Sequence, residues 1–394
     1  MTQPPLEILR FDEKNLNNLD ETRYFLKKMK ISLGATSVSP SNGLRLETVK
    51  EIGILRTLQS PHVINLKGLA IYDKGKPNGK DGDEKQSESN NKDTFLYMLF
   101  PRMVTNLRDY FCHIYSNKML GVITPDVVRS YAAQLLLALE HCHQRGIVHR
   151  NVTPDNILVA NDGLIKLGGF GSARYLMGLA RPLSQDEWKV NRPDVAWYLA
   201  PESLLNCPSC STQVDIWSAG LIITEMFNEG KILLPGTTEV EQLMYIFRLR
   251  GTPTESQWPG VTGLANFRSV AIKWPGEPLR KQLSSHFVDF NILQLLEILL
   301  KVSPYLRCTA TAALAHDYFL KANLEKKGDT REQSPTLDKL TSSPREQEET
   351  TAASISEKKR KKQSADTSVT KTKSAERTSE FPAKRRRSPR NKEV

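Results

Sequence analysis

The 394-residue chain has no hydrophobic run that approaches the roughly 20 residues a membrane-spanning helix needs. Its N-terminal stretch, MTQPPLEILRFDEK, also lacks the apolar core of a signal peptide. Only five cysteines are present, and Cys207 and Cys210 form a single C-x-x-C pair with no second pair to complete a tetrahedral zinc site. These absences exclude a disulfide scaffold and predict a soluble intracellular protein in which both cysteines are ordinary loop thiols.

Residues 324–394 are poor in the side chains that build a core. From residue 325 onward the chain holds 19 Ser and Thr residues and a single aromatic, Phe381. The same stretch has 19 Lys and Arg against 12 Asp and Glu, so it carries +7 of the net charge of +11. This composition predicts a disordered basic tail.

Two basic clusters of the tail, KKRKK at 358–362 and KRRR at 384–387, are typical of nuclear import signals. Nucleic-acid binding through counterion release is the alternative. The clusters are short and no aromatic side chain is interleaved to stack on bases. We therefore expect a nuclear protein whose tail binds an import receptor, with no specific nucleic acid and no membrane as partners.

Residues 1–323 have the patterns of a folded domain. VINLKGLAIY and TFLYMLF are short runs rich in β-forming residues. The polar insert at 73–93 lies between them and holds no aliphatic or aromatic side chain. These runs predict two neighbouring strands joined by a long surface loop.

Three helical patterns accompany these strands. Val49, Ile52, Leu55 and Leu58 recur on one face of an expected helix. The dipeptide Thr124-Pro125 predicts the capped start of a longer helix, and IWSAGLIITEMF is apolar nearly all round, as in a buried helix. Together they predict an α+β fold with a small N-terminal sheet and one helix, followed by a larger, mainly helical part.

Seven motifs follow one another along this domain. They are YFLKKMK (24–30), KEIGILRTL (50–58), HRNVTPDN (149–156), KLGGFGSAR (166–174), WYLAPE (197–202), STQVDIWSAGLI (211–222) and LLPGTTEVEQLMYIFRLRGTPTESQWPGV (233–261). In this order they resemble the protein-kinase fold, and most closely the cyclin-dependent kinase family. The resemblance implies two lobes with ATP and magnesium as cofactors.

Three residues match the nucleotide site of that family. Lys27 matches the lysine that orients ATP, and Glu51 matches the helix glutamate that pairs with it. Asn156 matches the second metal ligand, and alone it would be a weak site for a hard cation. The resemblance therefore assigns cofactor binding to these three residues.

Other positions depart from the family's catalytic pattern. Asn151 replaces the aspartate that accepts the substrate proton, and a neutral amide has no lone pair basic enough for that role. Gly169 replaces the aspartate that binds magnesium, and Thr153 replaces the lysine that neutralises the transferring phosphate. The first glycine of the chain is Gly34, so no G-x-G-x-x-G motif precedes Lys27.

These changes predict a pseudokinase, a catalytically inactive nuclear scaffold or regulator that works by protein binding. Loss of one principal catalytic residue costs on the order of 10⁴ to 10⁶ in rate in other enzymes. The alternative is an atypical serine/threonine kinase of low activity that uses ATP, with Asp155 or Asp162 as a substitute carboxylate. Asp155 fills the family's variable position and Asp162 lies in an Asn-Asp-Gly turn, so we favour the inactive protein.

Several retained residues match architectural positions of the family. His149 and Phe170 match residues that stack between the lobes, and Asp215 matches the residue that holds the backbone of the catalytic loop. Glu202 and Arg307 match a structural ion pair. We expect these residues to support a folded scaffold.

The resemblance also implies a phosphate-binding cluster made by Lys50, Arg150 and Arg174. Family members are activated by a phosphothreonine held there, but between Tyr175 and Tyr198 this chain has no threonine and only Ser184. The acidic pair 186–187 is a candidate permanent occupant of the cluster. Ordinary solvated loop acids are the alternative.

The sequence RLETVKE, residues 45–51, stands where the family has its P-S-T-A-I-R-E cyclin contact. We therefore assign partner binding to Val49, Lys50 and Glu51, with a cyclin-like protein or another nuclear protein as the partner. Val49 is the candidate anchor because it is apolar at a position where a surface helix favours a polar residue. A core-facing Val49 is the alternative.

Overall fold

The computed structural model describes residues 8–10, 24–31, 44–74, 93–116, 123–176, 196–208, 211–270, 272–283 and 290–320. Chain contacts divide the protein into a unit of residues 1–337, which contains all of these, and a unit of residues 338–394. Most of the predicted insert at 73–93 and the whole predicted tail at 324–394 lie outside the described residues. Within the described ranges no helix is long and apolar enough to cross a membrane.

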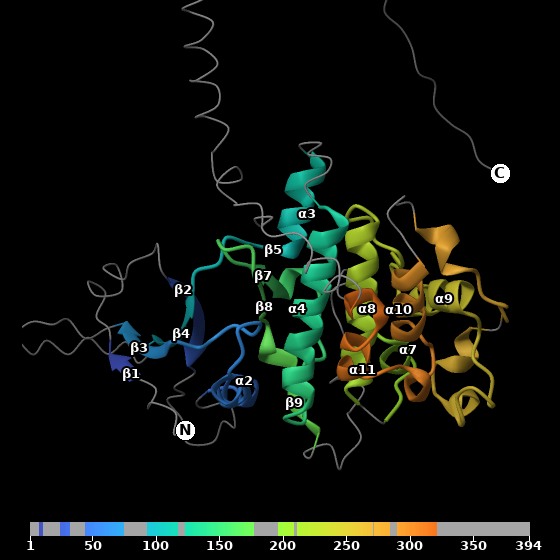
Figure 1. Cartoon of the computed structure of the whole chain (residues 1–394). Coiled ribbons are helices and arrows are strands. Elements are labelled where there is room, and N and C mark those ends of the chain that lie inside the picture. The colour runs from blue at the N-terminus through green and yellow to red at the C-terminus, as the bar shows by residue number, and fades with distance from the viewer. Residues whose placement is uncertain are drawn as a thin grey trace, which may run out of the picture. The chain divides into compact units, whose positions relative to one another are not determined.

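A four-stranded sheet forms the N-terminal part, with the strand order β1-β3-β4-β2 (Figure 1). Its strands are β1 (Ile8–Arg10), β2 (Tyr24–Ile31), β3 (Gly68–Lys74) and β4 (Asp93–Pro101). β2 and β3 both pair antiparallel with β4, and β1 runs parallel to β3. The prediction of neighbouring strands on either side of the insert is therefore confirmed.

Helix α2 (Leu46–Thr57) accompanies this sheet, and its buried side includes part of the predicted stripe, since Leu55 and Leu58 are each 2% exposed. Its buried residues include Glu51 and Leu55, whereas Val49 is 51% exposed. The prediction that Val49 shares the buried face with Leu55 is wrong. The physical reason is the helical period, because residues 49 and 51 are separated by about 200° around the helix axis. The ion pair with Lys27 places Glu51 on the buried side of α2, so Val49 lies on the opposite, exposed side.

The C-terminal part is mainly helical, and its longest helix, α4, packs against α8 and α11 (Figure 1). Thr124 caps α4 by accepting a hydrogen bond from the Val127 amide at 3.3 Å, which confirms the predicted start. Every residue from Val214 to Phe227 is buried in α8, which confirms the predicted buried helix. The helices are α3 (Leu107–Ser116), α4 (Pro125–His143), α7 (Pro201–Leu204), α8 (Gln213–Phe227), α9 (Glu239–Arg250), α10 (Phe290–Leu299) and α11 (Ala310–Leu314).

Short strands and single helical turns make up the remaining elements of the described residues. Strands β5, β7 and β8 form a three-stranded sheet, and β6 pairs with β9. Their bounds are β5 (Thr105–Asn106), β6 (Ile147–Val148), β7 (Ile157–Val159), β8 (Ile165–Leu167) and β9 (Arg174–Tyr175). The turns are η1 (Pro154–Asn156), η2 (Phe170–Ser172), η4 (Val261–Gly263), η5 (Phe267–Ser269), η6 (Leu279–Gln282) and η7 (Pro304–Leu306). The predicted α+β architecture is thus confirmed.

Candidate functional site

Lys27 and Glu51 form an ion pair between the sheet and α2. Lys27 Nζ lies 2.7 Å from Glu51 Oε1 and 2.8 Å from Oε2, and Glu51 is buried. Side chains alternate along a strand, so Met29 and Phe25 share the face of Lys27. Thr48 of α2 donates to Met29 Sδ at 3.4 Å on that face. The predicted pairing of Lys27 with Glu51 is confirmed, and the 60% exposed ring of Phe25 lies two residues away from Lys27 on the same face.

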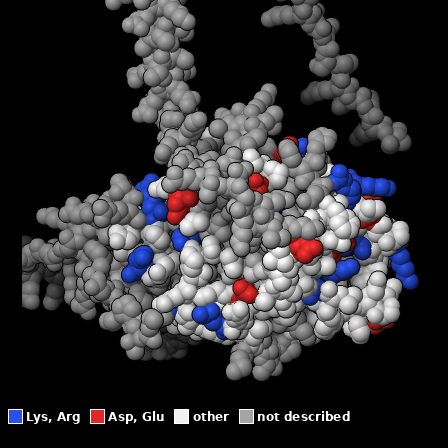
Figure 2. All heavy atoms as spheres, viewed as in Figure 1, with Lys and Arg blue, Asp and Glu red and all other residues white. Residues whose placement is uncertain are grey.

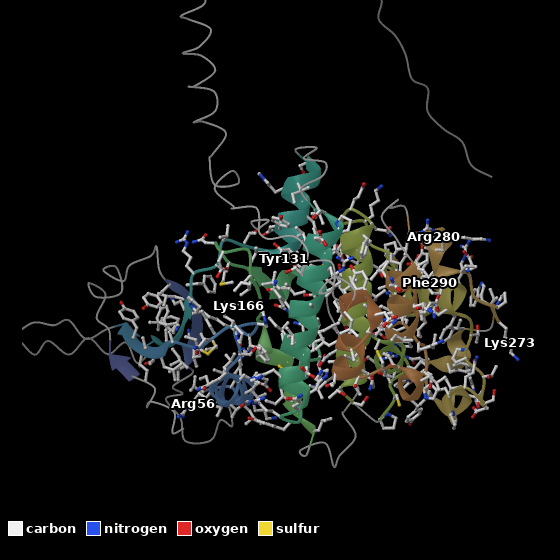
Figure 3. The ribbon with its side chains drawn as sticks, in the orientation of Figure 1. Arg56, Tyr131, Lys166, Lys273, Arg280 and Phe290 are labelled. Carbon is white, nitrogen blue, oxygen red and sulfur yellow. The ribbon has the colours of Figure 1, made fainter. Side chains whose placement is uncertain are left out.

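The chain that follows α2 is fixed to β8. Lys166, labelled in Figure 3, donates a hydrogen bond from Nζ to the Pro61 carbonyl. The backbone amide of Ile64 donates to Leu167 O at 2.9 Å, and the Leu167 amide donates to His62 O at 2.8 Å. These bonds attach the C-terminal end of α2 to the segment that leads into residues 168–172.

Asp215 holds the backbone of the loop at residues 149–151. Its carboxylate accepts hydrogen bonds from the His149 amide at 2.9 Å and the Arg150 amide at 2.7 Å, and lies 2.9 Å from His143 Nε2. Burial would raise the pKa of Asp215, but the hydrogen bond and charge of His143, together with His149, hold that pKa below its usual value. The loop can therefore adopt the left-handed φ of 67° at Arg150, and the predicted role of Asp215 is confirmed.

His149 is a neutral, fully buried side chain that contacts Phe170. The two ring centroids lie 4.6 Å apart in an edge-to-face arrangement, which confirms the predicted stacking. The Asn151 amide donates to Nδ1 at 3.3 Å, so Nε2 carries the proton and donates to Gly168 O at 2.7 Å. Burial lowers the pKa of His149. The ring thus joins the 149–156 loop to the 168–172 turn.

Of the two changed residues of the 149–156 loop, Thr153 is buried and Asn151 is half-buried. The amide oxygen of Asn151 is buried and has no hydrogen-bond partner within the described part of the chain. Thr153 is 3% exposed, and its carbonyl accepts from the Asn156 amide at 3.0 Å. Neither side chain supplies a base or a cation at this loop.

Gly169 and Asn156 lie against each other. Gly169 has a left-handed φ of 76°, and a Cβ atom added to it would lie within 3.0 Å of three side-chain atoms of Asn156, namely Oδ1, Cγ and Nδ2. Asn156 Nδ2 donates to Asn151 O at 2.9 Å. The amide of Asn156 thus fills the space that a side chain at position 169 would occupy.

These residues do not fit a magnesium ion. Magnesium needs about six oxygen ligands at roughly 2.0–2.1 Å, and the carboxylate that the protein-kinase pattern places at position 169 is absent. Among the described residues there is no group of three or more His, Cys, Asp or Glu that could hold a metal. Asn156 remains the single candidate oxygen ligand from the sequence prediction, and its amide is directed at Gly169.

The two candidate substitute carboxylates have other partners. Asp155 accepts a hydrogen bond from Arg108 Nε at 3.1 Å. Asp162 is exposed and accepts from the Leu164 amide at 3.0 Å, and the φ of 75° at Gly163 completes the predicted turn. Asp155 is therefore held by an ion pair with α3, and Asp162 is explained by its local turn.

An ionic cluster at the start of α3 was missed by sequence reasoning. Arg108 donates to Tyr198 Oη at 2.9 Å and lies 3.5 Å from Glu225 Oε1, in addition to its bond to Asp155. Burial raises the pKa of Glu225 to about 7, although Tyr198 and Arg108 oppose this rise. The four residues come from four distant segments, so no local pattern signals the cluster. It ties the WYLAPE segment to α3 and α8.

The predicted phosphate-binding residues Lys50, Arg150 and Arg174 are all among the described residues, whereas their expected occupants are not. Arg174 Nη1 donates to its neighbouring carbonyl, Ala173 O, at 2.8 Å. Lys50 is half-buried on α2. Ser184 and the acidic pair 186–187 lie outside the described residues, so the proposed occupant of the cluster stays a prediction.

Charges on the described surface are mixed. On the face drawn in Figure 2, Lys and Arg side chains are interspersed with Asp and Glu and with uncharged residues. A groove for nucleic acid would instead gather Lys and Arg on one face. The face shown therefore has no such patch among its described residues.

A family model described as "Protein kinase domain" matches residues 16–319. The match covers the two residues of the ion pair, the 149–156 loop, the 168–172 turn and Asp215. It extends over more than three quarters of the 394 residues.

Proposed function

This chain belongs to the protein kinase family, and from that premise we propose that it is a catalytically inactive, cyclin-dependent-kinase-like member that acts as a nuclear scaffold or regulator. Protein kinases generally transfer phosphate from ATP with the help of magnesium. The observation that carries the proposal is the contact of Asn156 with Gly169, because it fills the place of a metal-binding carboxylate.

The chemistry of the 149–156 loop supports the same proposal. Asn151 has a neutral amide where a base is needed, and Thr153 has no positive charge. Phosphoryl transfer depends almost entirely on positioning and on neutralising charge, so several losses in one site leave the γ-phosphate without support. What this chain keeps, the ion pair of Lys27 and Glu51, holds α2 against the sheet.

The retained ion pair also favours the second candidate, an atypical serine/threonine kinase of low activity that uses ATP. Such a kinase would need a new arrangement of ligands around the phosphates. Asp155 would have to leave Arg108 to contribute to it.

The deciding experiment is phosphoryl transfer by the purified full-length chain. We expect labelled phosphate from ATP to enter neither the chain itself nor a proline-directed peptide above the level of Lys27→Ala, with either magnesium or manganese. A catalytically active cyclin-dependent kinase with its cyclin serves as the positive control. Turnover that Lys27→Ala removes would establish the low-activity kinase instead.

The tail is proposed to direct nuclear import through an import receptor. We expect replacement of the basic residues of KKRKK and KRRR by alanine to abolish nuclear accumulation, because Lys and Arg clusters carry the signal. Fluorescence microscopy of the tagged full-length chain measures this. Replacing Ser334 and Ser343 by alanine, which leaves both clusters intact, is the control. Unchanged nuclear accumulation of the alanine-cluster variant would refute the assignment.

Phosphorylation of the tail is expected to modulate import. Ser388 precedes a proline and follows Arg385–Arg387 directly. A phosphate there would carry about −1.5 to −2 charges and partly neutralise the cluster.

A further inference from the structure

We propose that Asn156 is a positioning residue that takes the place of a bound metal, because its amide packs on Gly169 and joins the 149–156 loop to the 168–172 turn. The turn then supports α2 in its inward position without nucleotide or metal. This inference rests on the proposed function and deepens it, since an inactive scaffold needs a fixed α2.

The contact between Asn156 and Gly169 depends on the absence of a side chain at position 169. All three terminal atoms of the Asn156 side chain lie in the space that a Cβ atom would need. The left-handed φ of 76° adds a second requirement for glycine. The close packing of the Asn156 amide therefore requires glycine at position 169.

Asn156 is itself fixed by three hydrogen bonds. Its side chain donates to Asn151 O at 2.9 Å, and its backbone amide donates to Thr153 O at 3.0 Å. Its carbonyl accepts from the Gly168 amide at 2.8 Å. The residue thus bonds to its own loop on one side and to the 168–172 turn on the other.

The contacts continue from the turn to α2 and the sheet. Phe170 packs against His149, and α2 packs against η2. A Cβ atom on Gly171 would lie 3.7 Å from Glu51 Oε2, so this carboxylate is in van der Waals reach of the turn. Glu51 then binds Lys27 of β2. An unbroken series of contacts between protein groups leads from Asn151 to the sheet.

A double-mutant cycle on the full-length chain tests the contact. We expect Gly169→Ala to raise the equilibrium constant for unfolding, because the new methyl group overlaps the Asn156 side-chain amide. This increase should be about 10-fold or more larger than the increase caused by placing alanine at a positive φ alone. Gly146→Ala measures the φ cost alone, since Gly146 has a φ of 66° and nothing within 4 Å of its added Cβ. In an Asn156→Ala background the excess cost of Gly169→Ala should shrink to about 3-fold or less.

Asn156→Gly serves as a second background if Asn156→Ala does not fold, because glycine also removes all three overlapping atoms. An excess cost that is equal in the parent and in the variant background would overturn the proposal. So would a rise in melting temperature of the parent chain on addition of magnesium chloride, with or without ATP.

The experiments distinguish failure of the proposed inactive function from failure of the positioning role of Asn156. Phosphoryl transfer by a chain whose cycle shows the expected coupling would refute the inactive function and leave the contact in place. A cycle without coupling in a chain that transfers no phosphate would refute the positioning role alone.

Discussion

Replacing Arg307 by alanine is expected to lower the free energy of unfolding by about 3–5 kcal/mol, because it leaves the Glu202 carboxylate buried without its partner. Glu202 is 2% exposed and the Arg307 side chain is fully buried. Denaturant unfolding of the full-length chain followed by circular dichroism gives the midpoint and the slope needed for this comparison.

The large effect follows from how completely Arg307 is bonded. Its guanidinium binds both oxygens of Glu202, at 2.7 and 3.1 Å, and donates to Lys301 O at 3.0 Å. It also lies over the ring of Trp217, with Cζ 5.2 Å from the centroid. Alanine would remove all of these interactions and leave a cavity next to a charge.

Arg248→Ala is the matched control, because it removes the same functional group from an exposed pair. Arg248 Nε lies 3.1 Å from Glu277 Oε1, and the two side chains are 64% and 36% exposed. Exposed pairs contribute about 0–1 kcal/mol. Equal losses for Arg307→Ala and Arg248→Ala would contradict the difference that burial is expected to make.

The pair has a functional consequence for a scaffold. Glu202 ends the WYLAPE segment, and Arg307 also donates to Gln213 O at the start of α8. The segment is therefore attached to the helical part by protein groups alone.

Interactions could be predicted from the sequence where both partners occupy recognisable motif positions. Lys27 and Glu51, and likewise Glu202 and Arg307, occupy motif positions that predict their pairing, and both ion pairs are present. Motif positions also predict the contacts of Asp215 and the stacking of the His149 ring. Such pairs are predictable because a buried charge needs a partner of opposite sign.

Other features depend on three-dimensional detail that no motif contains. The overlap between Asn156 and the missing Cβ of Gly169 is a matter of distances shorter than a van der Waals contact. The cluster around Arg108 joins side chains that are as much as 117 residues apart. The ion pair with Lys27 places Glu51 on the buried side of α2, so Val49 is exposed. Hydrophobic periodicity alone predicts that Val49 is buried.

The exposed side of α2 now supports the partner-binding part of the proposed function. Leu46 is 60% exposed, Val49 51% and Leu44 37%. The alternative of a core-facing Val49 is excluded by its exposure. Leu46 and Val49 on the first turn of α2, together with Leu44 just before the helix, therefore form a candidate contact, at the position where the cyclin-dependent kinase pattern has its cyclin-binding residues. Lys50, which is half-buried, and Glu51, which is engaged by Lys27, border this contact.

Val49→Glu is expected to weaken binding of a cyclin-type partner by about 10-fold or more, because a carboxylate would be buried against an apolar surface in the complex. The substitution should leave the melting temperature of the free chain nearly unchanged, since Val49 is solvent-exposed and surface changes are usually within about 0.5 kcal/mol. A panel of purified cyclins, each titrated against the parent chain, first identifies the partner. The same titration of Val49→Glu then gives the loss of affinity.

Val240→Glu on α9 is the matched control, because the same residue type is exchanged at a similar exposure of 40% on a different helix. It should bind the identified cyclin as the parent chain does. Equal binding by Val49→Glu and the parent chain would mean that the cyclin contacts another surface, and failure of every cyclin in the panel to bind would remove cyclins as the partner class. Arg45, Leu46 and Glu47 differ from the P-S-T-A-I-R-E pattern on the same stretch, so we expect the bound cyclin to differ from those that recognise that pattern.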